Sequence, residues 1–153
     1  MMDLYFEDLN IGDKFESKLS RILTEEDNIK YVELTEDYFP SHLDKEFNKK
    51  FNYNNVFISG NLLSNIADGL AYRDIKYKLI EYRGEDKKKW KNHLFPGDRI
   101  YIIDEIINKN KLNKNRGLIK IKREVKNQKH KLILSLIKKY TIEYKPNINP
   151  KLL

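Results

Sequence analysis

Two residue types that can carry out acid–base chemistry lie five positions apart in the stretch Asp37-Tyr38-Phe39-Pro40-Ser41-His42. A carboxylate beside an imidazole can position and deprotonate a water molecule. Pro40 fixes its own φ angle and disfavours the helical conformation at Phe39, so a bent, extended loop is expected here. On such a loop the side chains of Asp37 and His42 could converge on one small volume. From the spacing alone, an Asx-type turn with a structural histidine beside it is the favoured interpretation.

A helix over about residues 25–35 is expected to lead into this loop. Thr24 is a suitable N-cap, and the helix dipole favours the acidic residues of the first turn. The apolar stripe that would turn this helix toward the core is narrow and consists of Ile29, Val32 and Leu34. After the loop, Asp44 can cap a second short helix from Lys45 to Phe51. The predicted acid–base pair therefore lies between two helices.

The most apolar helix of the chain is predicted to begin at Gly60-Asn61 and to continue to Arg73. Its apolar residues recur at helical spacing, at Leu62, Leu63, Ile66, Ala67, Leu70 and Ala71. Such a helix is expected to be buried at the centre of the fold. Asp68 lies near the edge of the apolar stripe. It would either face a pocket, as a second carboxylate near Asp37, or face solvent as an ordinary helix residue, and the pattern leaves both open.

The rest of the chain is predicted to form strands. Alternating or apolar runs indicate strands at 14–23, 77–82, 99–107, 118–125 and 132–144, with a further strand of uncertain start around Trp90. Arg83-Gly84-Glu85-Asp86 is expected to break the pattern, and the Lys- and Asn-rich residues 108–115 to form a loop. One long apolar helix followed by antiparallel strands predicts an α+β fold, in which a sheet of about five strands wraps around the helix.

Such a sheet would bury the helix on one face only. The opposite face, with residues such as Ile103, Ile119 and Ile133, would need cover, and tight self-association is the cover that we expect. Two prolines end the last strand, so residues 1–145 are expected to form one domain and residues 146–153 a C-terminal tail.

The chain has 153 residues and a formal net charge of +7. This charge suits an anionic partner such as nucleic acid, a membrane surface or a phosphate-bearing molecule. The abundance of Lys, Asn and Ile is typical of an AT-rich genome, and we favour this explanation for most of the charge. Lys87-Lys88-Lys89-Trp90-Lys91 and Lys109-Asn110-Lys111 remain candidates for a phosphate contact. A nucleic-acid binder would rest on charge alone, because the chain has no recognisable nucleic-acid-binding motif.

Several kinds of site are excluded or disfavoured by composition. The chain has no cysteine, which excludes disulfides and thiolate metal sites. The three histidines are scattered without clustered carboxylates, so no metal site is expected, and His93 and His130 are expected to be surface or strand histidines. Ser59 and Ser64 lack the pattern of a nucleophile elbow. The acidic N-terminus is unlike a secretory signal and no apolar run could span a membrane, so a cytoplasmic protein is expected.

Four phrases of the sequence together resemble the MaoC-like enoyl-CoA hydratases and dehydratases, which have the hotdog fold of a central helix enclosed by an antiparallel sheet. These phrases lie in the same order and at similar spacing in that family, and the resemblance runs to about Tyr144. They are the opening Phe6-Glu7-Asp8-Leu9-Asn10-Ile11-Gly12-Asp13, the helix start Thr24-Glu25-Glu26-Asp27, the signature Asp37-Tyr38-Phe39-Pro40-Ser41-His42-Leu43-Asp44, and Gly60 at the start of the central helix. The residues Trp90 to Asp98 are similar to a later aromatic and Gly-Asp turn of the family.

The resemblance implies an enzyme that interconverts a 2-enoyl-CoA and a 3-hydroxyacyl-CoA. It implies that Asp37 and His42 are the catalytic pair that holds the water. Gly60, Asn61 and Asp68 are the residues that we expect to contact the substrate. The Gly60 N–H would stabilise the charge that develops on the thioester oxygen. No cofactor is implied beyond the coenzyme A of the substrate. The usual product stereochemistry of the family is (R), and its members are usually dimers or dimers of dimers, so a homodimer or higher homo-oligomer is expected here.

The chain departs from the family pattern at four places. Phe39 replaces the asparagine that commonly precedes the proline, Ser59 replaces a histidine before the helix glycine, and His93 stands where proline is usual. Asp68 occupies a place where a small hydroxyl residue is usual. These departures motivate a second hypothesis, a non-catalytic or specialised hotdog domain that binds acyl thioesters. A thioesterase is a third hypothesis and the least favoured, because the pattern around Asp37 and His42 is more typical of a hydratase.

Overall fold

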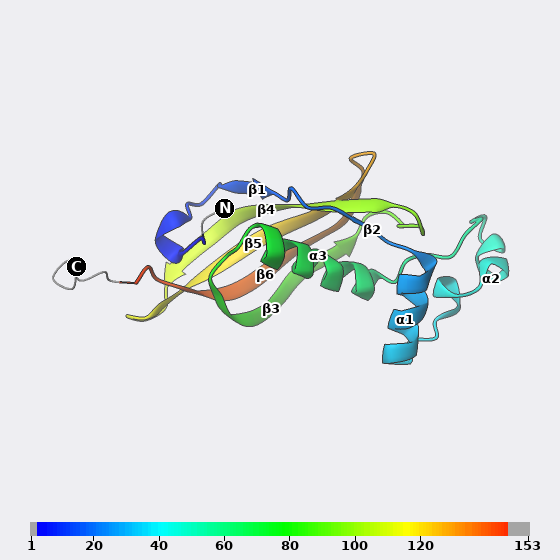
Figure 1. Cartoon of the computed structure of the whole chain (residues 1–153), viewed down its shortest axis with the longest axis horizontal. Helices are drawn as coiled ribbons and strands as arrows, with labels where there is room; N and C mark the ends of the chain where they lie inside the picture. Colours follow the sequence, from blue (N-terminus) through cyan, green and yellow to red (C-terminus); the bar gives the residue numbers. More distant parts are fainter. Residues whose placement is uncertain (1–2, 147–153) are drawn as a thin grey trace.

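The computed structural model describes residues 3–146, which form one antiparallel sheet and a helix that lies along it (Figure 1). The helical elements are η1 (Phe6–Asp8), α1 (Glu25–Thr35), η2 (Pro40–His42), α2 (Lys45–Lys49) and α3 (Gly60–Asp74). The strands are β1 (Lys14–Glu16), β2 (Arg21–Ile22), β3 (Leu79–Trp90), β4 (Arg99–Lys111), β5 (Arg116–Asn127) and β6 (Leu132–Glu143). The strand order is β1-β4-β5-β6-β3, and β2 also pairs with β4.

The core lies between α3 and one face of the sheet. Residues alternate between buried and more exposed positions along the whole of β5, and along β4 as far as Ile106. The buried set includes Ile102, Ile121 and Leu136 from the sheet and Leu63 and Leu70 from α3. Since each strand turns every second side chain toward the helix, the sheet and α3 bury one continuous apolar layer. The predicted α+β architecture, a sheet of this kind around a central helix, is confirmed.

The helix predictions rest on local signals, and most of their bounds agree with the structure. Thr24 caps α1, its hydroxyl accepting from the Asp27 N–H, while the Asp27 carboxylate accepts from the Thr24 N–H. This reciprocal pair is a capping box, in which the side chain of the third residue reaches back to the cap. The Asp44 carboxylate caps α2 without such a reciprocal bond, by accepting from the N–H groups of Glu46 and Phe47. α2 is shorter than predicted, because it ends at Lys49.

The predicted stripe of α1 is wrong for two of its three residues. Val32 is buried, but Ile29 is 41% exposed and Leu34 is 84% exposed. The residue that shares the buried face with Val32 is Asn28, one helical turn earlier. A helix turns the residues at i and i+4 to the same side, so a polar side chain occupies the position that an apolar one would normally hold.

Three strand predictions also need correction. The predicted strand at 14–23 divides into β1 and β2, because the Leu19 N–H donates to the Asp74 carboxylate instead of to a strand. The predicted break at 83–86 is absent: β3 is continuous and passes it through bulges, where the register with β6 shifts. Gly84 adopts a φ of 106° there, which glycine tolerates without a steric penalty. The predicted loop at 108–115 is shorter, since pairing with β5 continues to Lys111.

The sheet face opposite α3 differs from the expectation. Ile119 is fully buried on the helix side of β5, and Ile133 is 1% exposed at the start of β6. Of the three isoleucines assigned to the open face, only Ile103 is partly exposed. An apolar face that needs cover is therefore smaller than predicted. Most of the predicted tail at 146–153 lies outside the described residues.

Candidate active site

The loop that carries Asp37 and His42 is bent, as expected from Pro40. α1 ends at Thr35, and the C-cap residue Glu36 adopts the left-handed conformation with a φ of 58°. Phe39 is extended, with φ and ψ of −64° and 124°, in agreement with the restriction that a following proline imposes. The chain then makes the short turn η2, in which the His42 N–H donates to the Phe39 carbonyl oxygen at 3.0 Å. This turn directs the His42 side chain back toward the start of α3.

A cavity of about 330 Å³ lies between this loop, the start of α3 and the end of β3. Asp37, His42, Gly60 and Asn61 all line it. The structure thus brings together four of the five residues that the sequence singled out, although they come from separate elements. Asp68 does not line this cavity.

The orientation of the His42 ring follows from one hydrogen bond. Its Nδ1 lies 3.1 Å from the Phe57 carbonyl oxygen. A carbonyl oxygen can only accept, so Nδ1 carries the proton, and Nε2 of the neutral ring keeps its lone pair. The Phe39 ring packs edge-on against the imidazole, with ring centroids 5.6 Å apart. His42 is therefore held as a hydrogen-bond acceptor that can receive a proton at Nε2.

The first turn of α3 forms the opposite wall of the cavity. Ser59 is the N-cap, and its side chain makes no capping hydrogen bond. The N–H groups at the start of a helix have no acceptor within the helix, and the helix dipole gives this end a partial positive charge. Gly60 lies at this end, and the Trp90 ring lies against it. The arrangement can stabilise a negative charge that develops on a substrate oxygen.

His93 is exposed, as predicted for a surface histidine, and it also lines the same cavity. Its ring stacks face to face on Phe57, with centroids 4.0 Å apart and an interplanar angle of 5°. Tyr53 packs edge-on against it from a centroid distance of 5.0 Å. Burial of the ring, and secondarily the charge of Lys131, lower the pKa of His93. No local spacing in the sequence indicated this placement, because the stack joins two separate loops.

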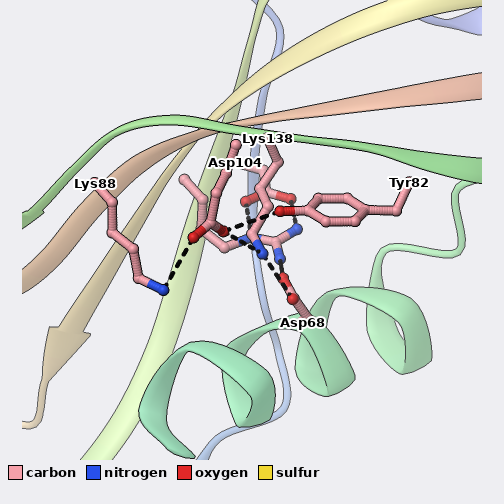
Figure 2. Close-up of polar contacts among 7 residues, drawn as sticks. Asp68, Tyr82, Lys88, Asp104 and Lys138 are labelled. Atoms are coloured by element: carbon pink, nitrogen blue, oxygen red, sulfur yellow. Dashed lines mark hydrogen bonds and ion pairs between the residues drawn. The ribbon is translucent and has the colours of Figure 1, made fainter. Parts of the chain in front are cut away.

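The structure places Asp68 in an ion-pair network between α3 and the sheet (Figure 2). Its two carboxylate oxygens accept from Arg123 and from Lys138, the latter at 2.8 Å. Arg123 also donates to both oxygens of Asp104, at 2.7 Å each. Both alternatives drawn from the sequence differ from this arrangement, since Asp68 neither approaches Asp37 nor simply faces solvent. Its carboxylate is occupied by two cations, which favours a structural role.

The network continues along β3. Lys138 also contacts Glu85 at 2.9 Å, and Glu85 accepts from Lys88 and from the Tyr82 hydroxyl (Figure 2). These residues and Asp68 line a second cavity of about 640 Å³. Burial alone would raise the pKa of Glu85, but hydrogen bonds from Lys138 and Lys88 outweigh it and lower the pKa to about 2. The acidic and basic side chains of this network therefore pair with one another.

Sequence reasoning missed two residues that shape the first cavity besides His93. Trp90 forms part of its wall from the end of β3. Asn28, on α1, is completely buried and does not itself line the cavity. The signal for Asn28 was its i, i+4 spacing to Val32, which places both on one helix face.

Within residues 3–146, no group of three or more His, Asp or Glu side chains is placed to hold a metal ion. Among the helices of that part of the chain, none is both long and apolar enough to cross a membrane.

Comparison with known proteins identifies the family. Residues 7–128 match the family model described as MaoC like domain. A monoamine oxidase regulatory protein from Archaeoglobus fulgidus has a similar structure, with a TM-score of 0.84 and 32% identity over 94% of this chain and 97% of that chain. The R-hydratase PhaJ1 from Pseudomonas aeruginosa has a TM-score of 0.75 and 20% identity over 94% of this chain and 88% of that chain.

A third similar structure, Rv0216 from Mycobacterium tuberculosis, is described as having a double hotdog fold. Its TM-score is 0.84 and its identity 15%, and the match covers 97% of this chain and 46% of that chain. Among curated proteins, none matches the sequence. The family model covers most of the chain, from the opening phrase through the acid–base loop and α3 to the end of β5. The protein therefore belongs to the MaoC-like domain family.

Proposed function

We propose that the protein is a hydratase/dehydratase that interconverts a 2-enoyl-CoA and a 3-hydroxyacyl-CoA. The observation that carries this proposal is the shared cavity, which Asp37, His42 and the N-terminal end of α3 line together, while the Nδ1 contact of His42 leaves Nε2 as the proton acceptor of the ring. Membership of the MaoC-like family and structural similarity to an R-hydratase support the reaction class.

In the hydration direction, His42 and Asp37 hold a water molecule whose oxygen attacks C3 of the enoyl group. One member of the pair takes a proton from this water, and the other delivers a proton to C2, so that one water is added overall. The Gly60 N–H stabilises the enolate-like charge on the thioester oxygen between these events. Dehydration follows the same path in reverse. No cofactor is required, because the thioester itself acidifies C2.

A cleft beside the cavity suits the nucleotide portion of coenzyme A. Trp90, Asn92 and His93 line both spaces. The cleft has a volume of about 430 Å³ and adds two aromatic rings and two cations, from Tyr53, Phe95, Lys91 and Lys131. Aromatic faces can stack on a base, and lysines can meet phosphates. Of the lysine cluster at 87–91, Lys91 is therefore the proposed phosphate contact, whereas Lys88 pairs with Glu85.

The central experiment follows the loss of enone absorbance when the purified protein is mixed with crotonyl-CoA and longer 2-enoyl-CoAs. Activity is expected in the unmodified protein and a loss of at least a hundredfold in Asp37→Asn and in His42→Ala, as is usual for removal of a general acid or base. Asp44→Asn serves as a control, because Asp44 follows the same signature but caps α2. Activity that is unchanged in both Asp37→Asn and His42→Ala would refute the assigned roles.

The second candidate is an acyl-thioester-binding protein without turnover. The packing of the Phe39 ring against His42 favours it, because this ring occupies space beside the imidazole. Calorimetric titration with a saturated acyl-CoA, together with the absence of turnover across enoyl-CoAs of several chain lengths, would support this candidate. Release of free thiol from acyl-CoA would instead indicate a thioesterase.

We also propose a cytoplasmic homodimer or higher homo-oligomer. β3 is a long strand at one edge of the sheet, and the exposed backbone of an edge strand is a template for pairing with another chain. The double hotdog of Rv0216 is a chain of about twice the length with two such folds, and it is consistent with paired domains. Light scattering coupled to size-exclusion chromatography measures the assembly directly, and a monomer at micromolar concentration would contradict this proposal.

A further inference from the structure

Asn28 is a polar side chain in a fully buried position, with 0% of its surface exposed. It lies in the first turns of α1, where the face toward the protein interior would normally be apolar. A buried carboxamide costs free energy unless its donors and acceptor are all paired. The partners of Asn28 therefore indicate what the residue is for.

The Asn28 amide makes three hydrogen bonds, each to the backbone of a different residue. Its Nδ2 donates to the carbonyl oxygens of His42 at 2.7 Å and of Phe57 at 3.0 Å. Its Oδ1 accepts from the Ser59 N–H at 2.8 Å. The chemistry of the partners fixes the orientation of the amide, because two carbonyls require a donor and an N–H requires an acceptor. Both N–H donors and the oxygen are therefore used.

Two of these contacts act on His42. One holds its backbone carbonyl, and the other holds the Phe57 carbonyl, which is the same oxygen that lies 3.1 Å from His42 Nδ1. The Phe57 N–H in turn donates to the Ser41 carbonyl at 2.9 Å, so the two segments are linked on both sides. The acceptor that selects the His42 tautomer is thus itself held by Asn28.

The third contact acts on the start of α3. Ser59 is the N-cap residue, and Gly60 follows it as the first residue of the helix. The bond from the Ser59 N–H to Asn28 therefore fixes the position of the helix end whose N–H groups face the cavity. One side chain connects the acid–base group on one wall with the hydrogen-bond donor on the other.

We propose that Asn28 is a positioning residue that sets the His42 tautomer and the distance between His42 and the N-terminal end of α3. Its effect on catalysis rests on the proposed hydratase function, whereas its effect on the His42 ring does not. Reacting groups must be held within about half an ångström of their productive geometry. A side chain that ties both walls to one rigid amide provides that constraint.

The first test compares Asn28→Leu with Asn48→Leu. Asn48 is a matched control, because it is 1% exposed and its Nδ2 also donates to two backbone carbonyls, those of Ser41 and Asn55. It contacts neither the Phe57 carbonyl nor the Ser59 N–H through these bonds. Nitrogen NMR of labelled histidine reports the tautomer of His42 without any enzyme assay. The Nδ1–H form is expected to dominate in the unmodified protein and in Asn48→Leu, and to lose its dominance in Asn28→Leu.

The second readout is kinetic. If the unmodified protein is a hydratase, Asn28→Leu is expected to lower kcat by about a hundredfold, the order of effect of a 1 Å misplacement of reacting groups. Its pH–rate profile is expected to shift, since the ring is no longer held as the Nδ1–H tautomer. Asn48→Leu is expected to keep the profile and most of kcat, although both variants lose stability. If the unmodified protein has no hydratase activity, the proposed function fails, and the NMR comparison still decides the role of Asn28.

A measurement on the unmodified protein covers the case in which Asn28→Leu does not fold. Couplings across hydrogen bonds are expected from the Asn28 side-chain nitrogen to the carbonyl carbons of His42 and Phe57, and the Ser59 amide proton is expected to exchange slowly. Absence of both couplings, or a His42 ring that carries its proton on Nε2, overturns the proposal. It is equally overturned if Asn28→Leu folds with an unchanged tautomer and loses no more kcat than Asn48→Leu.

Discussion

The Trp90 ring lies so close to Gly60 that a Cβ atom there would sit 2.8 Å from Cη2 and 2.9 Å from Cζ2 of the indole. The φ angle of Gly60 is not positive, so this glycine is required for space and not for an unusual backbone conformation. The indole covers the first residue of α3 and forms a wall of the cavity at the same time. The size of residue 60 and the position of Trp90 are thus coupled.

This coupling predicts the outcome of Gly60→Ala. The added methyl must displace the indole, and we expect kcat/KM to fall about tenfold or more because groups in the cavity shift from their productive geometry. Trp90→Ala in the same chain is expected to remove the clash. A double-mutant cycle on kcat/KM and on unfolding free energy measures the coupling, and additive effects of the two substitutions would contradict it.

Gly69 provides a matched control on the same helix. A Cβ at Gly69 would meet no atom within 4 Å. Gly69→Ala is expected to raise the free energy of unfolding by about 0.5–1 kcal/mol, because alanine loses less backbone entropy in a helix interior. Its activity is expected to be unchanged. Urea denaturation of both alanine variants checks the contrast.

The network under α3 predicts a large effect of removing Arg123. The side chains of Arg123 and Asp104 are 2% and 0% exposed, so Arg123→Met leaves a buried carboxylate without its partner. We expect the free energy of unfolding to fall by about 3–5 kcal/mol. The double variant Arg123→Met/Asp104→Leu is expected to recover much of this loss, because no buried charge remains unpaired. A double variant no more stable than Arg123→Met alone would refute the account.

The carboxylate of Glu85 predicts a loss of stability in acid. Its pKa is about 2 in the folded protein, below the reference value of 4.5. The unfolded chain therefore binds a proton more readily, so the contribution of Glu85 is present above about pH 4.5 and is lost as the pH falls toward 2. Its side chain is 26% exposed, so solvent screening reduces the contribution to about 1–2 kcal/mol. Glu85→Gln is expected to flatten the pH dependence of unfolding over this window, and an unchanged slope would contradict the prediction.

The His93 ring is expected to titrate below the reference pKa of histidine, and NMR can follow this titration. Burial against Phe57, and then the charge of Lys131, lower its pKa from the reference value of 6.5. The neutral ring is favoured in the folded state, so the stability that it contributes is present above pH 6.5 and is lost as the pH falls through the folded pKa. Lys131→Ala is expected to raise the midpoint of the His93 titration. Lys129→Ala is the control and is expected to leave this midpoint unchanged. A midpoint at or above 6.5 in the unmodified protein would refute this assignment.

Local signals explain which parts of the fold could be predicted. The capping box at Thr24, the apolar period of α3 and the alternation of β5 depend on neighbouring residues, so these three elements lie where they were predicted, although β5 extends two residues further at each end. The continuation of β3 through Gly84 could not be predicted in this manner, because pairing with β6 overrides the local turn signal. Arg123 was within reach, since it lies in phase with Ile119, Ile121 and Val125 on the buried side of its strand.

The residues of the candidate site also fall into those that local sequence indicates and those that it does not. Asp37, His42 and Gly60 were found through a short motif and a helix start, which are features of contiguous sequence. Asn28 and His93 were not, because their roles depend on bonds and stacks between segments that meet only in three dimensions. The i, i+4 spacing of Asn28 to Val32 places it on the buried face of α1 but does not identify its partners, and the aromatic stack of His93 leaves no local spacing.

The segment from α1 through α2 lies at one end of the molecule, beyond the sheet (Figure 1). It carries Asp37 and His42, whereas the core between α3 and the sheet holds the fold together. Insertions, deletions and substitutions in the exposed parts of this segment can therefore reshape the entrance to the cavity without disturbing the core. Such a division makes the scaffold evolvable, and for protein engineers it marks Phe39, which lines the cavity and is 55% exposed, as a position to exchange without touching the core.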